Sequence, residues 1–163
     1  MSTNKYKSIV SKLKLEGRAY INGKYVDAID GKKFETINPA TGEILCSVAK
    51  CNIKDVNLAV QVSRKVFESG VWSRSTPEYR KEVLIKFAKL LSEQGEENSV
   101  LESLDTGKLI ADCINEVAND APMHFQWYGE LIDKVFGKVG ATDPSITSLI
   151  VKEPIGVIAG IVP

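Results

Sequence analysis

Apolar and polar positions alternate along residues 19–50, a pattern typical of half-buried strands. Asn22-Gly23 predicts a hairpin turn, because both residues tolerate positive φ. A second turn is predicted at residues 38–42, where Asn, Pro, Thr and Gly cluster. We therefore expect three short antiparallel strands in this part of the chain.

After residue 50 the apolar residues recur every three or four positions, which predicts helices. Asn52 is the expected cap of the first helix, and Gly70 its expected end. Thr76-Pro77 predicts the start of a second helix, because proline suits the first helical position. Gly95 is expected to break or bend that helix, and Gly107 to end it.

A third helical region is expected after Lys108. Pro122 should divide it, with Asp120 capping the second half, because proline cannot donate a backbone hydrogen bond. From residue 138 onward the pattern becomes strand-like again and ends in the apolar run "IGVIAGIVP". Residues 1–18 are basic and weakly amphipathic, and they form an extension before the first strand.

Charge and composition exclude several classes of protein. The 163 residues contain 21 basic and 21 acidic side chains, so no net charge attracts nucleic acid or an anionic membrane. No stretch is apolar enough to span a bilayer, and residues 1–16 lack the apolar core of a secretory signal. Three cysteines without such a signal favour free thiols and a cytoplasmic location.

The residues alone supply no complete catalytic set. Cys46, Cys51 and Cys113 lack the spacing of a metal-binding pair, and we expect all three to be structural. His124 is the only histidine, which favours packing or exposure at the surface over catalysis. "LDTGK" at residues 104–108 is typical of a helix end and lacks the spacing of a phosphate-binding loop.

Five motifs occur in a specific order: "INGKYVDA", "INPATGEIL", "KDVNLAVQVSRKVF", "LESLDTGK" and "KEPIGVIAGIVP". Together they resemble the amino-terminal part of the NAD(P)-dependent aldehyde dehydrogenase superfamily. "VWSRSTP" and "WYGELIDKVFGKV" are similar to dehydrogenases of γ-glutamylaminobutyraldehyde and related aminoaldehydes. The resemblance implies an α/β fold: short antiparallel strands, a helical segment, an oligomerisation hairpin, and the first strand of a Rossmann-like nucleotide-binding sheet.

The resemblance also implies boundaries within the chain. Residues 1–18 would be an extension, and residues 19–137 the strands and helices of the NAD-binding domain. Residues 138–155 would be the oligomerisation hairpin, and residues 156–163 the truncated first strand of the nucleotide-binding sheet. The implied partners are an aldehyde substrate and further copies of the chain, with no nucleic acid or membrane.

For the cofactor, NAD or NADP, the resemblance assigns Ile161, Val162 and Pro163 to the lining of the cleft. It places the catalytic Cys, the general-base Glu and the oxyanion-binding Asn beyond residue 163. We therefore expect the 163-residue chain to be inactive on its own. The alternative is a truncated, non-catalytic module that associates with partner chains through its strands.

Two further sites follow from the resemblance. Thr36 and Ile37 match backbone positions that bind a monovalent cation, and Asp105 matches the carboxylate of that site. Carbonyl oxygens and one carboxylate suit a hard cation. Glu116 and Asp120 match the mouth of the substrate tunnel, where they would favour an aldehyde with a distal amine. A solvated acidic face is the alternative interpretation of this pair.

Overall fold

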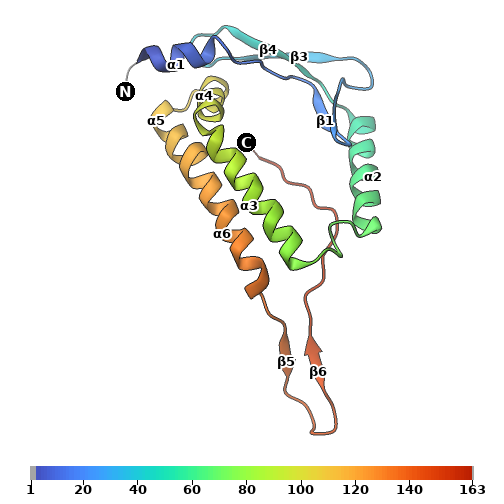
Figure 1. The fold of residues 1–163 in the computed structure, drawn as a ribbon. Helices are drawn as coiled ribbons and strands as arrows, with labels where there is room; N and C mark the ends of the chain where they lie inside the picture. The colour runs from blue at the N-terminus through green and yellow to red at the C-terminus, as the bar shows by residue number, and fades with distance from the viewer. Residues whose placement is uncertain (1–2, 163) are drawn as a thin grey trace.

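The first four strands form two separate antiparallel pairs at one end of the molecule, and a third pair projects at the other end (Figure 1). In this computed structural model, which describes residues 3–162, helix α1 precedes them. The elements are α1 (Thr3–Val10), β1 (Ala19–Ile21), β2 (Lys24–Val26), β3 (Lys33–Ile37) and β4 (Ile44–Ala49). β1 pairs with β2, and β3 pairs with β4.

The expectation of three strands was wrong: residues 19–50 contain four. A turn separates β2 from β3, and in it the Gly31 N–H donates to the Ala28 carbonyl at 2.8 Å. Gly31 has φ of 68°, a left-handed conformation that interrupts the extended backbone. The sequence carries a signal for this turn, Asp30-Gly31, which the expectation of three strands did not use.

Helix α2 (Ile53–Ser69) begins and ends where the sequence predicts. The Asn52 side chain accepts from the Lys54 N–H at 2.8 Å, and Asp55 accepts from the Asn52 N–H at 2.8 Å. Gly70, with φ of 78°, ends the helix. Asp55 also accepts from the Ile29 N–H at 2.8 Å. Asp55 is only 2% exposed, so its carboxylate needs such donors. One buried carboxylate therefore caps α2 and fixes the loop after β2.

Helices α3 (Pro77–Glu93) and α4 (Gly95–Thr106) also confirm the sequence prediction. The Thr76 hydroxyl accepts from the Tyr79 N–H at 3.2 Å, and Gly107 ends α4 with φ of 74°. The chain bends between α3 and α4 at Gly95, which packs tightly on another segment. A Cβ built there would lie 2.7 Å from the Ala118 Cβ.

The third helical region runs without a break from residue 110 to residue 134. It consists of α5 (Ile110–Cys113), the π-helical turn η1 (Ile114–Asp120), α6 (Ala121–Leu131) and the short 3₁₀ turn η2 (Ile132–Lys134). The expectation that Pro122 divides this region and that Asp120 caps the second half was wrong. Asp120 is helical and its side chain caps nothing. Pro122 lies in the first turn of α6, where a missing N–H is tolerated.

The helices pack on one another through small residues and aromatic rings. Phe87 of α3 and Phe125 of α6 meet edge to face, with their centroids 4.7 Å apart. Gly129 brings α6 close to α3, since a Cβ built there would lie 3.1 Å from the Leu84 Cβ. Ser99 of α4 is fully buried, and its hydroxyl lies 2.6 Å from the Gly95 carbonyl.

The last part of the chain is a projecting hairpin followed by an unpaired segment (Figure 1). β5 (Lys138–Gly140) pairs with β6 (Ser148–Ile150). Residues 151–162 contain no strand, although the pattern predicts one from residue 156. A strand requires a hydrogen-bonded neighbour, and no other described segment pairs with these residues. Ile155 and Ile161 are consequently 92% and 97% exposed.

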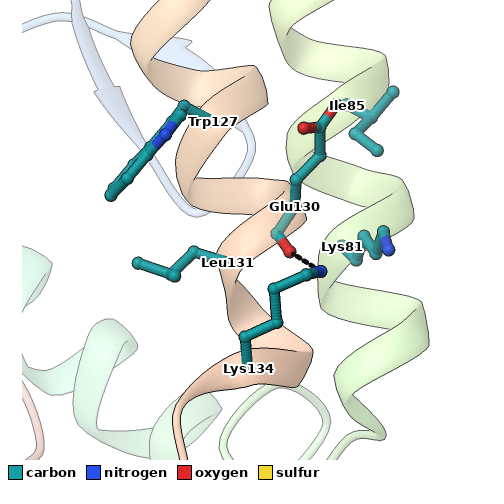
Figure 2. A pocket seen from close by; sticks show the side chains of 6 residues that line it. All are labelled: Lys81, Ile85, Trp127, Glu130, Leu131 and Lys134. Atoms are coloured by element: carbon teal, nitrogen blue, oxygen red, sulfur yellow. Dashed lines mark hydrogen bonds between the residues drawn. The ribbon is translucent and has the colours of Figure 1, made fainter.

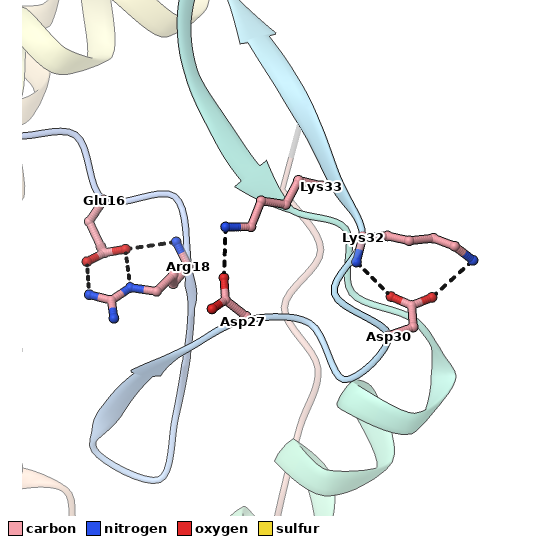
Figure 3. Close-up of polar contacts among 6 residues, drawn as sticks. All are labelled: Glu16, Arg18, Asp27, Asp30, Lys32 and Lys33. Carbon is pink, nitrogen blue, oxygen red and sulfur yellow. Dashed lines mark hydrogen bonds and ion pairs between the residues drawn. The ribbon is translucent and has the colours of Figure 1, made fainter.

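Ion pairs on the surface join neighbouring residues of the amino-terminal region (Figure 3). Arg18 donates two side-chain hydrogen bonds to Glu16, at 2.8 and 2.6 Å. Asp27 pairs with Lys33, and Asp30 pairs with Lys32. Among the described residues, no helix is long and apolar enough to cross a membrane.

Asp55→Ala should lower the free energy of unfolding by about 2 kcal/mol, because two buried N–H groups lose their acceptor. Urea denaturation would measure the loss. Glu78→Ala is the control, since Glu78 is also in the first turn of a helix but exposed. The control should change stability by no more than about 0.5 kcal/mol. Equal losses in the two variants would contradict the role of Asp55.

Glu16 should titrate well below a typical glutamate. The Arg18 side-chain hydrogen bonds, followed by its backbone N–H, lower the pKa of Glu16 from 4.5 to about 2. A lowered pKa in the folded state means that the pair stabilises the fold above pH 4.5. That stabilisation is lost as the pH falls from 4.5 towards 2.

Carbon NMR of the Glu16 carboxyl group would measure its titration midpoint. Arg18→Gln should move this midpoint upward, towards the value of a free glutamate. It should also remove the part of the pH dependence of stability that arises in this window. An unchanged midpoint in the variant would show that Arg18 does not hold the carboxylate.

Candidate functional site

The candidate cation site lies where the strands meet the helices. The Thr36 hydroxyl on β3 donates to Asp105 Oδ1, in the last turn of α4, at 2.7 Å. Next to this contact, Gly107 packs against a ring from the β3–β4 turn: a Cβ built on Gly107 would lie 2.7 Å from Pro39 Cγ. The structure therefore brings together Thr36 and Asp105, which are 69 residues apart in sequence.

The pairing of β3 with β4 is irregular at this point. Thr36 lies opposite Cys46 and Ile37 opposite Ile44, so Leu45 of β4 is the extra residue of a bulge. Such a bulge interrupts the ladder of strand hydrogen bonds and bends the bulged strand. The ladder is therefore interrupted directly opposite Thr36 and Ile37, the strand residues of the candidate cation site.

Asp105 forms no ion pair with any residue in the described part of the chain. Lys108, the nearest cationic residue in sequence, instead donates a hydrogen bond to Glu116 on η1. This hydrogen bond raises the pKa of Lys108. Lys108 is therefore not the partner of Asp105. The Asp105 carboxylate has Thr36 as its partner and retains acceptor capacity for a cation.

Glu116 and Asp120, the two tunnel candidates, lie at the start and end of η1 and differ in their partners. Glu116 is bound by Lys108, whereas no hydrogen bond or ion pair joins the Asp120 carboxylate to another described residue. The backbone N–H of Ala121 reaches the Glu116 carbonyl five residues back, so the two acidic residues lie within one π-helical turn. Of the two, Asp120 is the carboxylate available for a cationic ligand.

A shallow cavity of about 330 Å³ lies on α6 directly after Asp120. Its walls are the side chains of Met123, His124, Trp127 and Tyr128. His124 is exposed, as the sequence predicts, and its Nδ1 lies 2.7 Å from the Asp120 carbonyl. The indole and phenol rings meet at right angles, with their centroids 4.9 Å apart. An aromatic wall is a suitable surface for an ammonium group.

A larger groove between α3 and α6, of about 490 Å³, has three charged side chains in its lining: Lys81, Glu130 and Lys134 (Figure 2). Asp133 accepts from Lys81 at 3.1 Å and from Lys134 at 2.6 Å. Lys134 also donates to the Glu130 backbone carbonyl at 2.6 Å, the contact drawn in Figure 2. The Glu130 carboxylate accepts from the Gln126 side-chain amide at 2.9 Å. Both lysines therefore have partners, and the pair of Lys81 with Asp133 joins α3 to η2.

The cysteines show no sign of an activated nucleophile. Cys113 is fully buried and Cys51 is exposed. Burial raises the pKa of both thiols, with Asp55 adding to the effect at Cys51. A raised pKa disfavours the reactive thiolate. Within residues 3–162, no group of three or more His, Cys, Asp or Glu side chains could hold a metal ion.

The cofactor residues assigned by resemblance are not part of a formed site. Ile161 and Val162 are exposed in the unpaired segment after β6, and Pro163 lies outside the described residues. Their assignment therefore stays a prediction. Two features were not predicted from the sequence: the bulge of β4 opposite Thr36 and Ile37, and the pairing of Lys108 with Glu116. Neither has a local sequence signal, because each depends on a partner from another segment.

Comparison with known proteins defines the class. The sequence model of the aldehyde dehydrogenase family matches residues 25–163, so the chain belongs to this family. It is 39% identical to an aminoacetaldehyde dehydrogenase of Pseudomonas aeruginosa, over 100% of this chain and 33% of the relative. It is 43% identical to the NADP/NAD-dependent aldehyde dehydrogenase PuuC of Escherichia coli, over 93% of this chain and 30% of the relative.

The fold agrees with a solved structure from the same family. The crystal structure of a γ-glutamyl-γ-aminobutyraldehyde dehydrogenase from Burkholderia cenocepacia superposes with a TM-score of 0.84 and 38% identity. The superposition covers 88% of this chain and 29% of that one. The chain thus spans about a third of the length of its relatives and corresponds to their amino-terminal segment.

Proposed function

We propose that this segment is the amino-terminal part of an NAD(P)-dependent dehydrogenase that oxidises an aminoaldehyde to the carboxylic acid. The observation that carries the proposal is the family match, together with relatives that act on aminoacetaldehyde and γ-glutamyl-γ-aminobutyraldehyde. NAD or NADP accepts the hydride when bound. This segment would contribute part of the cofactor cleft, the tunnel mouth and a cation site.

The chemistry needs groups that residues 1–163 do not supply. In the family, a cysteine thiolate adds to the aldehyde carbon, hydride leaves for the nicotinamide, and water activated by a glutamate releases the acid. None of Cys46, Cys51 and Cys113 corresponds to that nucleophile. The alternative is a non-catalytic module that binds other chains through its strands. In that case the unpaired residues 151–162 would pair with a partner chain.

At the tunnel mouth, Asp120 would attract the distal ammonium group of the substrate. Its carboxylate has no hydrogen-bond or ion-pair partner in the described chain, and Asp120 comes just before the helix that carries Trp127 and Tyr128. A carboxylate and aromatic faces together favour a cation through charge and through the ring quadrupole. Glu116 would contribute less, because Lys108 already neutralises it.

For the cation, Thr36 and Ile37 would supply backbone oxygens, and Asp105 a carboxylate oxygen. This donor set fits a monovalent cation such as K⁺. The Thr36–Asp105 contact supports the proposal, as does the interruption of the β3–β4 pairing between Thr36 and Ile37. The cation would join β3 to the end of α4.

The β5–β6 hairpin is the proposed surface for association with a second copy. It projects from the helices, and Val139 and Leu149 are exposed on it (Figure 1). Apolar side chains on a projecting ribbon are typical of an interface between subunits. Light scattering that shows a monomeric full-length enzyme would contradict this proposal.

Asp120→Ala in the complete dehydrogenase should raise KM for aminoaldehydes by about fivefold, as expected for one lost exposed charge interaction. KM for neutral aliphatic aldehydes should change little. Steady-state kinetics with matched amino and neutral substrates would measure both values. Glu116→Ala serves as the control and should have the smaller effect, because Lys108 occupies that carboxylate. Equal effects on both substrate classes would remove the proposed role of Asp120.

Residues 1–163 alone should not reduce NAD⁺ in the presence of an aldehyde, whereas the complete chain should. Absorbance of the reduced nicotinamide would follow the reaction. Should the short chain show activity, replacing each cysteine by serine would identify the group responsible. Activity that disappears in one of these variants would overturn the assignment of the nucleophile to the remainder of the enzyme.

A further inference from the structure

We propose that residues 3–18 are a strap that holds α4 against the β3–β4 sheet and thereby positions Asp105 for Thr36. This amino-terminal strap contacts the helix at one end and the sheet at the other. Its effect on a bound cation rests on the proposed cation site. Its effect on the Thr36–Asp105 contact rests on the observed geometry alone.

One end of the strap is fixed to the start of α4. The Lys5 ammonium group forms an ion pair and hydrogen bond with Glu96, in the first turn of α4. Ile9 and Lys12 line a shallow cavity of about 480 Å³ whose other wall is the junction of α3 with α4. Residues of the strap thus contact this junction through both charged and apolar groups.

The other end is fixed to the outer edge of β4. The Ala49 N–H donates to the Gly17 carbonyl at 2.7 Å, so the strap adds to the side of β4 that does not pair with β3. The approach is close: a Cβ built on Gly17 would lie 2.1 Å from the Ser47 carbonyl oxygen. Only glycine permits this contact without a shift of the backbone. The Arg18 guanidinium adds a contact with the ring of Tyr25, 5.7 Å from its centroid.

These contacts hold α4 at both ends. Glu96 is in its first turn and Asp105 in its last, roughly 14 Å apart along the helix at 1.5 Å per residue. The strap joins the first turn to β4, and Asp105 joins the last turn to β3, which pairs with β4. When one of the two contacts forms, it holds α4 near the sheet. The groups of the other contact then have a higher effective concentration for each other. The coupling is reciprocal, so a ligand at Asp105 would also favour a docked strap.

The strap lies before residues 25–163, the part that matches the aldehyde dehydrogenase family. It is therefore an addition to the segment that the family has in common. The aminoacetaldehyde dehydrogenase relative aligns over all 163 residues and so includes the corresponding region. In our proposal, this region therefore contains a segment, the strap, that raises the affinity of the cation site.

A double-mutant cycle tests the positioning directly. Urea denaturation of the 163-residue chain would give the folding equilibrium constants of wild type, Lys5→Ala, Asp105→Ala and the double variant. Asp105→Ala removes the acceptor of the Thr36 hydroxyl. Sites this far apart are normally additive. We expect a departure from additivity of about threefold in the equilibrium constant, because each contact strengthens the other. Lys89→Ala is the matched control: Lys89 pairs with Glu93 on the surface of α3 and should be additive with Asp105→Ala. Additivity in both cycles would overturn the proposal.

A cation titration provides a readout that a merely structural role would not change. Amide NMR shifts of Ile37 and Asp105 would be followed against K⁺, with tetramethylammonium keeping the ionic strength constant. Lys5→Ala and Gly17→Ala should raise the half-saturating K⁺ concentration by about threefold, as the coupling predicts. Asp105→Asn should abolish saturation. An unchanged half-saturation in both strap variants would overturn the effect on the cation.

The outcomes separate the strap from the proposals on which its ligand depends. If the wild-type chain shows no saturable response to K⁺, the cation site is rejected, and with it the effect of the strap on cation binding. The mutant cycle then decides whether the strap positions Asp105 for Thr36. If Gly17→Ala does not fold, Lys5→Ala retains the test, because Lys5 is exposed. Dehydrogenase activity enters neither measurement, so failure of the proposed enzymatic function is seen separately.

Discussion

The contact between Thr36 and Asp105 is the interaction on which the candidate site depends. It joins β3 to the last turn of α4, two elements that no sequence motif links. The same contact explains why Asp105 remains available to a cation, since Lys108 is held by Glu116. Its geometry depends on the alignment of the sheet with α4, to which the amino-terminal strap and the packing of Pro39 on Gly107 both contribute.

The helices depend on small residues at their closest approaches. Gly95 meets Ala118, and Gly129 meets Leu84, at distances that leave no room for a side chain. The buried apolar residues of the described chain are likewise small, among them Ala88, Val100 and Cys113. Large apolar side chains remain at the surface. This distribution agrees with a segment that spans about a third of its relatives.

Charge partners distinguish the acidic residues near the proposed tunnel. Glu116 and Asp120 are similar in the sequence and lie in the same π-helical turn, but only Glu116 has a lysine partner. The specificity that we propose for the dehydrogenase therefore rests on Asp120 and on the aromatic surface of the helix that follows it. In the larger groove between α3 and α6, both lysines have partners within the described chain.

The sequence by itself determined the family and the helix boundaries that depend on local chemistry. Asn52 and Gly70 bound α2, and Thr76 begins α3, because capping requires only residues within one turn. Only the tertiary structure decided the course of the helix through Pro122, since packing of η1 on α4 holds that region helical. It also decided the meeting of Thr36 with Asp105. The strand expected from residue 156 did not form, because a strand needs a hydrogen-bonded neighbour that its own sequence cannot supply.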